Sequence, residues 1–229
     1  AFMKKQKDAE KLANEMIEIG KLANRETICV LTNMEEPLGK SIGNSLEVKE
    51  AVKALNGEME EDVKQVVLEL GVYMLKLAEI SDDTDKARKL LEKNIKNGKA
   101  YKKFKQLVEN QGGDVTYLSE INNEDDAKFI EPIYCEKSGY VYEIKAKEVG
   151  KIACDLGAGR IRKEDKIDPA VGIVLEKKIG DMVAKDEVLA YIHANDLEKL
   201  QIAKEKLIKV IKVRKEKVEP IKNIIEVIK

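Results

Sequence analysis

The sequence predicts an α/β fold in the first half of the chain and an α+β domain in the second. Up to residue 111, apolar residues recur at helical spacing around one short β-branched run, TICVLT, at 27–32. After Gly113 the helical spacing gives way to alternating apolar and polar residues separated by frequent glycines. We therefore divide the chain into 1–111, the α/β part, and 112–229, the α+β C-terminal domain, with the polar stretch INNEDDAKF close to the boundary.

In the first half, the run at 27–32 predicts a buried strand, and we expect it to pair in parallel because helices precede and follow it. The surrounding helices are recognised by their apolar periodicity and by the residues that start and stop them. We expect helices over 5–23, from Asn44 to near Gly57, over 60–79, from a cap at 82–84 to near 97, and onward to 111.

The second half contains the alternating segments EPIYCEKSGYVYEIKAKEVG and AVGIVLEKKIGDMVAKDEVLAYIHA, with a helix predicted near 147–155 and another after Asp196. Residues 172–192 resemble the half-motif of biotinyl and lipoyl carrier domains, which implies a sandwich-like β sheet. A carrier presents a modifiable lysine at a hairpin tip, and here that position reads IHAND, without a lysine. The missing lysine argues against a swinging arm.

The composition excludes several classes of function. The chain has 42 basic and 43 acidic residues, which argues against a nucleic-acid-binding surface. No apolar run approaches the roughly 20 residues that span a bilayer, so we expect no membrane partner. The three cysteines, Cys29, Cys135 and Cys154, lack zinc-ligand spacing and are typical of free thiols in a reducing cytoplasm. The single histidine, His193, ends an apolar strand pattern, which favours a structural or surface role over catalysis.

Two glycine-containing stretches are candidates for binding. Residues 36–53, EPLGKSIGNSLEVKEAVK, form a loop that leads into a helix, with Asn44 or Ser45 as the N-cap and Glu47 at capping-box spacing. Residues 156–160, LGAGR, are flexible enough for backbone amides to approach a phosphate, with Arg160 adding charge. A tight turn explains Gly157 and Gly159 equally well, so the role of this stretch stays open.

Three blocks of the sequence resemble successive blocks of the pyrimidine-nucleoside phosphorylases and thymidine phosphorylases. They are AFMKKQKDAEKLANEMIEIGKLANRE, EPLGKSIGNSLEVKEAVKALNGE and LGAGRIRKEDKIDPAVGIVLEKKIGDMVAKDEVL, and they occur in the family's order. The resemblance implies that the chain is the C-terminal portion of a longer enzyme and begins inside the α/β domain. The segments that hold phosphate and pyrimidine would lie upstream, so we assign no catalytic, phosphate-binding or base-binding residue here, and we expect this chain alone to be inactive.

The resemblance also implies half of a potassium site. The matching ligands are the backbone carbonyls of Leu38 and Ser41 and the side chain of Glu50, all hard oxygen donors. Glu47, three residues earlier, is an alternative ligand. Without the resemblance, the same stretch is explained as a helix cap with two surface glutamates.

The implied activity is the phosphorolysis of uridine, thymidine or deoxyuridine to the free base and a pentose 1-phosphate. The implied partners are phosphate and a pyrimidine nucleoside, and the implied full-length enzyme is a cytoplasmic homodimer. Two alternatives stay open at this point: a nucleotide (AMP-type) phosphorylase of the same superfamily, and a non-enzymatic lipoyl- or biotinyl-like binding module. The preference between uridine and thymidine is not decided by these residues.

Overall fold

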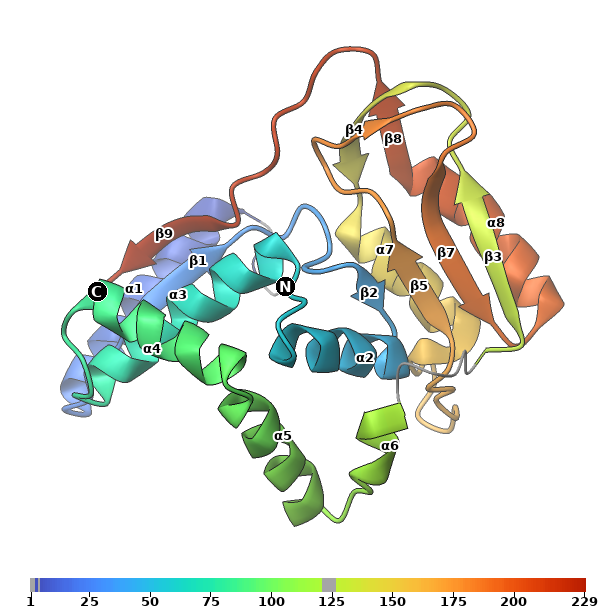
Figure 1. Ribbon diagram of the computed structural model, residues 1–229. Helices are drawn as coiled ribbons and strands as arrows, with labels where there is room; N and C mark the ends of the chain where they lie inside the picture. The colour runs from blue at the N-terminus through green and yellow to red at the C-terminus, as the bar shows by residue number, and fades with distance from the viewer. Residues whose placement is uncertain (1–2, 4, 121–126) are drawn as a thin grey trace. The chain divides into compact units, whose positions relative to one another are not determined.

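A computed structural model describes residue 3 and residues 5–120 and 127–229 of the chain (Figure 1). Most of the polar stretch that we placed near the domain boundary, at 121–126, therefore lies outside the described residues. The chain folds into two compact units, each assembled from separate segments. The first unit comprises Ala1–Met34, Glu61–Ala100 and Lys222–Lys229, and the second comprises Glu35–Glu60 and Tyr101–Ile221. The predicted division into 1–111 and 112–229 runs along the chain instead, and it stays a prediction.

The first unit contains helices α1, α3 and α4 and a two-stranded sheet (Figure 1). Their bounds are α1 Gln6–Leu22, β1 Cys29–Thr32, α3 Glu61–Leu77, α4 Thr84–Lys96 and β9 Ile224–Ile228, and α5 Lys99–Asn110 begins at its edge. These helices confirm the periodicity argument. The predicted cap of α4 is also confirmed, because the Asp83 carboxylate accepts hydrogen bonds from the backbone N–H groups of Asp85 and Lys86.

The pairing of β1 corrects the sequence prediction. We expected a parallel strand, but β1 pairs antiparallel with β9, and Cys29 lies opposite Ile228. The two strands come from opposite ends of the chain (Figure 1). Within β1, Leu31 is buried and the other three residues are half-buried. The β-branched composition identified the strand correctly, but the partner comes from residues 224–228, which the sequence argument did not consider.

The second unit holds the other strands and helices. Their bounds are β2 Ser41–Ile42, α2 Asn44–Leu55, α6 Thr116–Glu120, β3 Phe129–Tyr134, β4 Gly139–Ile144, α7 Ala146–Ala153, β5 Gly172–Leu175, β6 Met182–Val183, β7 Val188–Ala194, α8 Leu197–Val210 and β8 Ile211–Arg214. One antiparallel sheet has the order β2-β5-β7-β3, and another has the order β6-β4-β8. The predicted change to a strand-rich second half is thus confirmed.

Residues of both sheets and of α7 and α8 share one hydrophobic core in the second unit. Ile173 of β5 lies opposite Ile192 of β7, and both side chains are fully buried. Helix α8 packs on β7 and β3 (Figure 1), and it begins after Asp196, as the sequence predicted, with Asp196 as its N-cap. The more specific expectation of a sandwich stays a prediction. Within the ranges described above, every helix is too short or too polar to cross a membrane.

Candidate functional site

The loop that precedes α2 has a shape that requires glycine. Gly39 has φ +71°, in the left-handed region that glycine adopts at little cost. A Cβ atom at this position would lie 2.6 Å from Oε1 of Glu50, closer than a van der Waals contact permits. The lack of a side chain at Gly39 therefore lets the loop backbone lie directly against the Glu50 carboxylate.

Both carboxylate oxygens of Glu50 bind this loop. Oε1 accepts a hydrogen bond from the Lys40 N–H at 2.8 Å, and Oε2 accepts one from the Ser41 N–H at 2.9 Å. Hydrogen bonds to a charged acceptor are stronger than neutral ones, so this pair fixes the loop on the first turns of α2. Each carboxylate oxygen can accept more than one hydrogen bond or ligand, so the contacts leave room for a further interaction.

Glu50 lies close to the loop backbone that carries the other two predicted potassium ligands, Leu38 and Ser41. Glu50 contacts the backbone of Ser41 directly and lies against Gly39, the neighbour of Leu38. The Leu38 side chain is half exposed, so this loop is accessible from solvent. The donor set of two carbonyl oxygens and a carboxylate is a hard one and fits a potassium ion chemically.

Glu47 holds a different part of the backbone. It lies at the start of α2, and its Oε1 accepts a hydrogen bond from the Gly43 N–H at 3.1 Å. The helix N-cap is Gly43, not Asn44 or Ser45 as predicted. Gly43 occupies this position because a Cβ atom there would lie 2.6 Å from the Val171 carbonyl oxygen. The two glutamates therefore anchor two successive backbone segments, and the alternative ligand Glu47 lies against Gly43.

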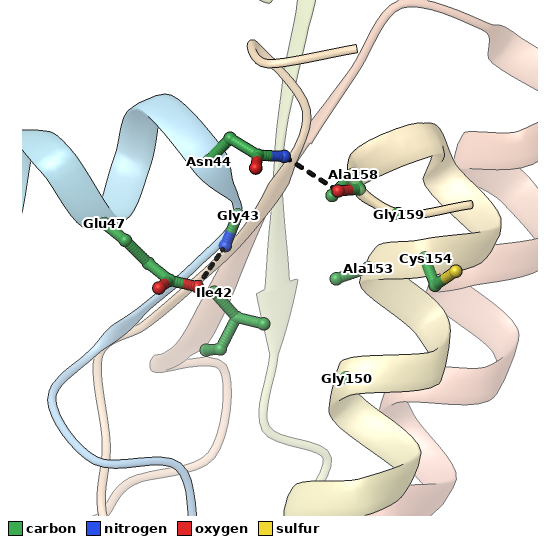
Figure 2. Close-up of a pocket in the computed structure, with 9 residues that line it drawn as sticks. All are labelled: Ile42, Gly43, Asn44, Glu47, Gly150, Ala153, Cys154, Ala158 and Gly159. Atoms are coloured by element: carbon green, nitrogen blue, oxygen red, sulfur yellow. Dashed lines mark hydrogen bonds between the residues drawn. The ribbon is translucent and has the colours of Figure 1, made fainter. Parts of the chain in front are cut away.

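The Asn44 side chain makes a long-range hydrogen bond instead of capping α2 as predicted. Its Nδ2 donates a hydrogen bond to the Ala158 carbonyl oxygen at 2.7 Å, as Figure 2 shows. Ala158 belongs to the LGAGR stretch, where Gly157 has φ +122° and the Arg160 side chain is exposed. Leu156, Gly157 and Ala158 end a short π-helical segment, Cys154–Ala158, that follows α7, and this segment meets the start of α2.

A small pocket lies between the start of α2 and the end of α7 (Figure 2). Its volume is about 170 Å³, and its lining residues are Ile42, Gly43, Asn44, Glu47, Gly150, Ala153, Cys154, Ala158 and Gly159. A larger hollow of about 510 Å³ adjoins the same helix and is lined by Asn44, Ser45, Glu47, Val48, Ala51, Phe104, Tyr117 and Pro169. The first turns of α2 thus line both hollows and also carry Glu50, which binds the preceding loop.

Lys178, which no sequence pattern marked as a candidate, also contacts this loop. The Lys178 ammonium group donates hydrogen bonds to the carbonyl oxygens of Pro37 and, at 2.9 Å, of Gly39. It lies 3.6 Å from Oε1 of Glu36, whose other oxygen accepts a hydrogen bond from the Ile179 N–H. Because these partners are more than 130 residues apart in sequence, no local pattern could have revealed the contact.

The remaining candidates are His193 and the three cysteines. His193 is 9% exposed in β7, where it lies opposite Gly172 of β5, and its structural or surface role stays a prediction. All three cysteines are free thiols, and burial raises the pKa of Cys29. In the part of the chain that the structure describes, no group of three or more His, Cys, Asp or Glu side chains could hold a metal ion. The predicted potassium site would use two backbone carbonyl oxygens and one carboxylate, so it is not a cluster of this kind.

Comparison with known proteins gives two family matches and a set of similar enzymes. The model of the family described as pyrimidine nucleoside phosphorylase C-terminal domain matches residues 140–214, and that of the glycosyl transferase family, a/b domain, matches residues 1–101. The pyrimidine-nucleoside phosphorylase of Bacillus subtilis (strain 168) is 47% identical over 195 residues, which cover 85% of this chain and 45% of that protein. That of Geobacillus stearothermophilus is 44% identical over 213 residues, or 93% of this chain and 49% of that protein. The chain spans about half the length of the curated relatives it matches.

Proposed function

Because this chain belongs to the pyrimidine-nucleoside phosphorylase family, we propose that the whole protein catalyses the phosphorolysis of pyrimidine nucleosides. The observation that carries the proposal is the 44–47% identity to enzymes of that name over most of this chain. Two family matches in the first and second halves of the chain support it, because a carrier module would account for the second half only.

In the proposed reaction, an oxygen of inorganic phosphate forms a bond to C1 of the pentose while the bond from C1 to the base nitrogen breaks. The electron pair of the broken bond leaves with the pyrimidine, which takes up a proton to give the free base. Such a displacement needs a phosphate held in line with the leaving base and an environment that stabilises the developing charges. It also needs water excluded, since water would compete with phosphate as the nucleophile.

In that reaction, we propose that this chain fixes the conformation of the loop that precedes α2. Gly39 allows the backbone to approach Glu50, and Glu50 fixes Lys40 and Ser41 through their N–H groups. The carbonyls of Leu38 and Ser41 and the Glu50 carboxylate would hold a potassium ion. When bound, such an ion supplies positive charge and ties its oxygen ligands together. The stretch 156–160 meets α2 at the pocket in Figure 2, so we assign its glycines to shaping that pocket.

The cellular setting that we propose is the one implied by the family resemblance. The whole protein would act in the cytoplasm as a homodimer on phosphate and a pyrimidine nucleoside. The free thiols Cys29, Cys135 and Cys154 support a reducing compartment. This chain by itself would be inactive, because the family resemblance assigns phosphate and base contacts to segments outside it.

The test is a phosphorolysis assay on the whole purified protein. Uridine, thymidine, deoxyuridine and AMP are each incubated with and without phosphate, and the free base and pentose 1-phosphate are measured by chromatography and ³¹P NMR. We expect phosphate-dependent release of base from a pyrimidine nucleoside and none from AMP. Release of adenine from AMP would favour the nucleotide phosphorylase instead, and release of base without phosphate would mean hydrolysis. We expect the isolated chain of 229 residues, assayed in parallel, to release no base.

A further inference from the structure

The Lys178 side chain is nearly buried against the Pro37–Gly39 loop. Its side chain is 16% exposed, and that of its ion-pair partner Glu36 is 7% exposed. An ammonium group removed from water is costly unless oxygen atoms replace its hydration shell. Here the replacement comes from two carbonyl oxygens, of Pro37 and Gly39, and from the Glu36 carboxylate. The ammonium group is therefore surrounded by the kind of oxygen donors that also coordinate a metal cation.

Two side chains of opposite charge bind residues 37–41: a cation binds backbone carbonyl oxygens, and an anion binds backbone N–H groups. The Lys178 cation binds the carbonyl oxygens of Pro37 and Gly39, whereas the Glu50 anion binds the N–H groups of Lys40 and Ser41. The loop conformation therefore depends on α2 and on the turn that carries Lys178, and also on β5, whose Leu175 N–H donates a hydrogen bond to the Lys40 carbonyl oxygen at 2.8 Å. Loss of either charge releases one half of these contacts.

The position of Lys178 is itself fixed. Its backbone N–H donates to the Asp181 carboxylate at 2.8 Å, and its carbonyl oxygen accepts from the Asp181 N–H at 3.1 Å. The Gly180 N–H donates to the Val141 carbonyl oxygen of β4 at 2.9 Å, and the Ile179 N–H donates to Glu36. The turn that carries Lys178 is therefore bound both to β4, through Gly180, and to Glu36, which precedes the Pro37–Gly39 loop.

We propose that Lys178 is a positioning residue that acts as the built-in cation of the Pro37–Gly39 loop. Its ammonium group keeps the loop in the conformation in which Leu38, Ser41 and Glu50 lie together, without an added ion. The consequence for potassium binding rests on the proposed function, whereas the loop-holding contact does not. Its removal should therefore loosen the loop first and affect the ion only through the loop.

The test is amide hydrogen exchange on this chain with Lys178→Ala and chemical rescue. We expect exchange at the Lys40 and Ser41 amides to become about tenfold faster, which corresponds to roughly 1.4 kcal/mol of local opening. Propylammonium has the three carbons and the ammonium group that the substitution removes, so it should restore slow exchange. Tetramethylammonium at the same ionic strength, which cannot donate hydrogen bonds, should not. Lys178→Arg, which keeps the cation and its donors, should exchange more like the original chain than like Lys178→Ala.

The matched control is Lys177→Ala. Lys177 lies on the same turn and pairs with Glu187 rather than with the loop, so its removal should leave the Lys40 and Ser41 amides unchanged. Unchanged exchange in Lys178→Ala, an equal effect of Lys177→Ala, or equal rescue by tetramethylammonium would each overturn the proposal. If Lys178→Ala does not fold, Lys178→Gln replaces it and must show the same local loosening.

The potassium experiment separates this inference from the proposed function. Binding of ²⁰⁵Tl⁺, a potassium substitute, to the whole protein is followed by NMR before and after Lys178→Arg and Lys178→Gln. Weaker binding in Lys178→Gln than in Lys178→Arg supports the positioning role. Binding that is equally strong in both variants would overturn the effect of Lys178 on the ion. No binding even in the unsubstituted protein would instead overturn the proposed potassium site and leave the exchange result to decide the role of Lys178.

Discussion

The two compact units differ in how completely they bury their apolar side chains, although both consist of amphipathic elements. In the second unit, side chains such as Ile133, Ile173 and Ile192 are almost inaccessible and belong to one continuous core. In the first unit, α1 leaves Met16 50% and Ile19 66% exposed. Among the largest side chains that are essentially inaccessible in the described residues, Leu68 comes from the first unit and the rest come from the second.

This difference in burial predicts a difference in stability between the two units. Burial of apolar area is the main favourable term in folding, so the second unit should be the more stable one. The loop that Lys178 and Glu50 hold belongs to that second unit. In the first unit, Leu22 of α1 and Met74 of α3 are also among the exposed large apolar side chains. Each of the following predictions tests one side of this contrast.

The largest expected effect comes from a core substitution. Ile192→Ala in β7 removes a side chain with 0% exposure and should lower the free energy of unfolding by about 2–5 kcal/mol, because a cavity remains. Ile19→Ala in α1 should change it by less than about 0.5 kcal/mol, since that side chain is already largely in water. Urea unfolding followed by circular dichroism measures both. Equal losses would remove the distinction between the units.

The second prediction compares two glycines of nearly equal backbone conformation. Gly39 has φ +71° and faces Glu50, whereas Gly98 in the first unit has φ +73° and no heavy atom within 4 Å of the place where a Cβ atom would lie. Gly98→Ala should cost only the left-handed strain of about 1–2 kcal/mol. Gly39→Ala should cost about 1 kcal/mol more, because its methyl group would collide with the carboxylate. Matching losses of unfolding free energy would show that Glu50 can move away freely.

The third prediction concerns two glutamates with different partners. Glu50→Gln replaces an acceptor oxygen by an NH₂ group that faces a backbone N–H, and it should cost about 1–3 kcal/mol. Glu69→Gln in the first unit weakens a partly exposed ion pair with Arg88, worth about 0–1 kcal/mol. In the whole protein, Glu50→Gln should also raise the potassium concentration needed for activity more than Glu47→Gln does. A potassium requirement unchanged by Glu50→Gln would mean that the wrong carboxylate was assigned.

The smallest expected effect is a pH dependence of the first unit. Asp83 caps α4, and the hydrogen bond that its carboxylate accepts from the Lys86 backbone N–H holds its pKa below the ordinary value. A lowered carboxyl pKa contributes stability above the pKa of the unfolded chain, and this contribution disappears as the pH falls through the folded-state pKa. We therefore expect the amides of α4 to exchange faster, relative to a pH-corrected reference, below about pH 4. Asp83→Asn should remove most of that dependence, and an unaltered pH profile would contradict the assignment.

The sequence by itself determined the helices, most of the strands and the family. Helical periodicity located α1, α2, α3 and α4 to within a few residues, because a repeat of 3.6 is a property of neighbouring positions. The loop, its glycines and Glu50 were identified from the block at 36–58, which resembles one family closely. All of this information is contained in short stretches of chain.

The tertiary structure alone decided which distant segments meet. β1 pairs with β9 from the far end of the chain, Asn44 binds the Ala158 carbonyl instead of capping its own helix, and Lys178 binds the Pro37–Gly39 loop. A strand pattern specifies that backbone groups need partners but not which partners, and a lysine in a turn is usually a solvated residue. In the folded chain, Lys178 lies 3.6 Å from Glu36, although the two residues are far apart in sequence, so only the tertiary structure identifies the partner.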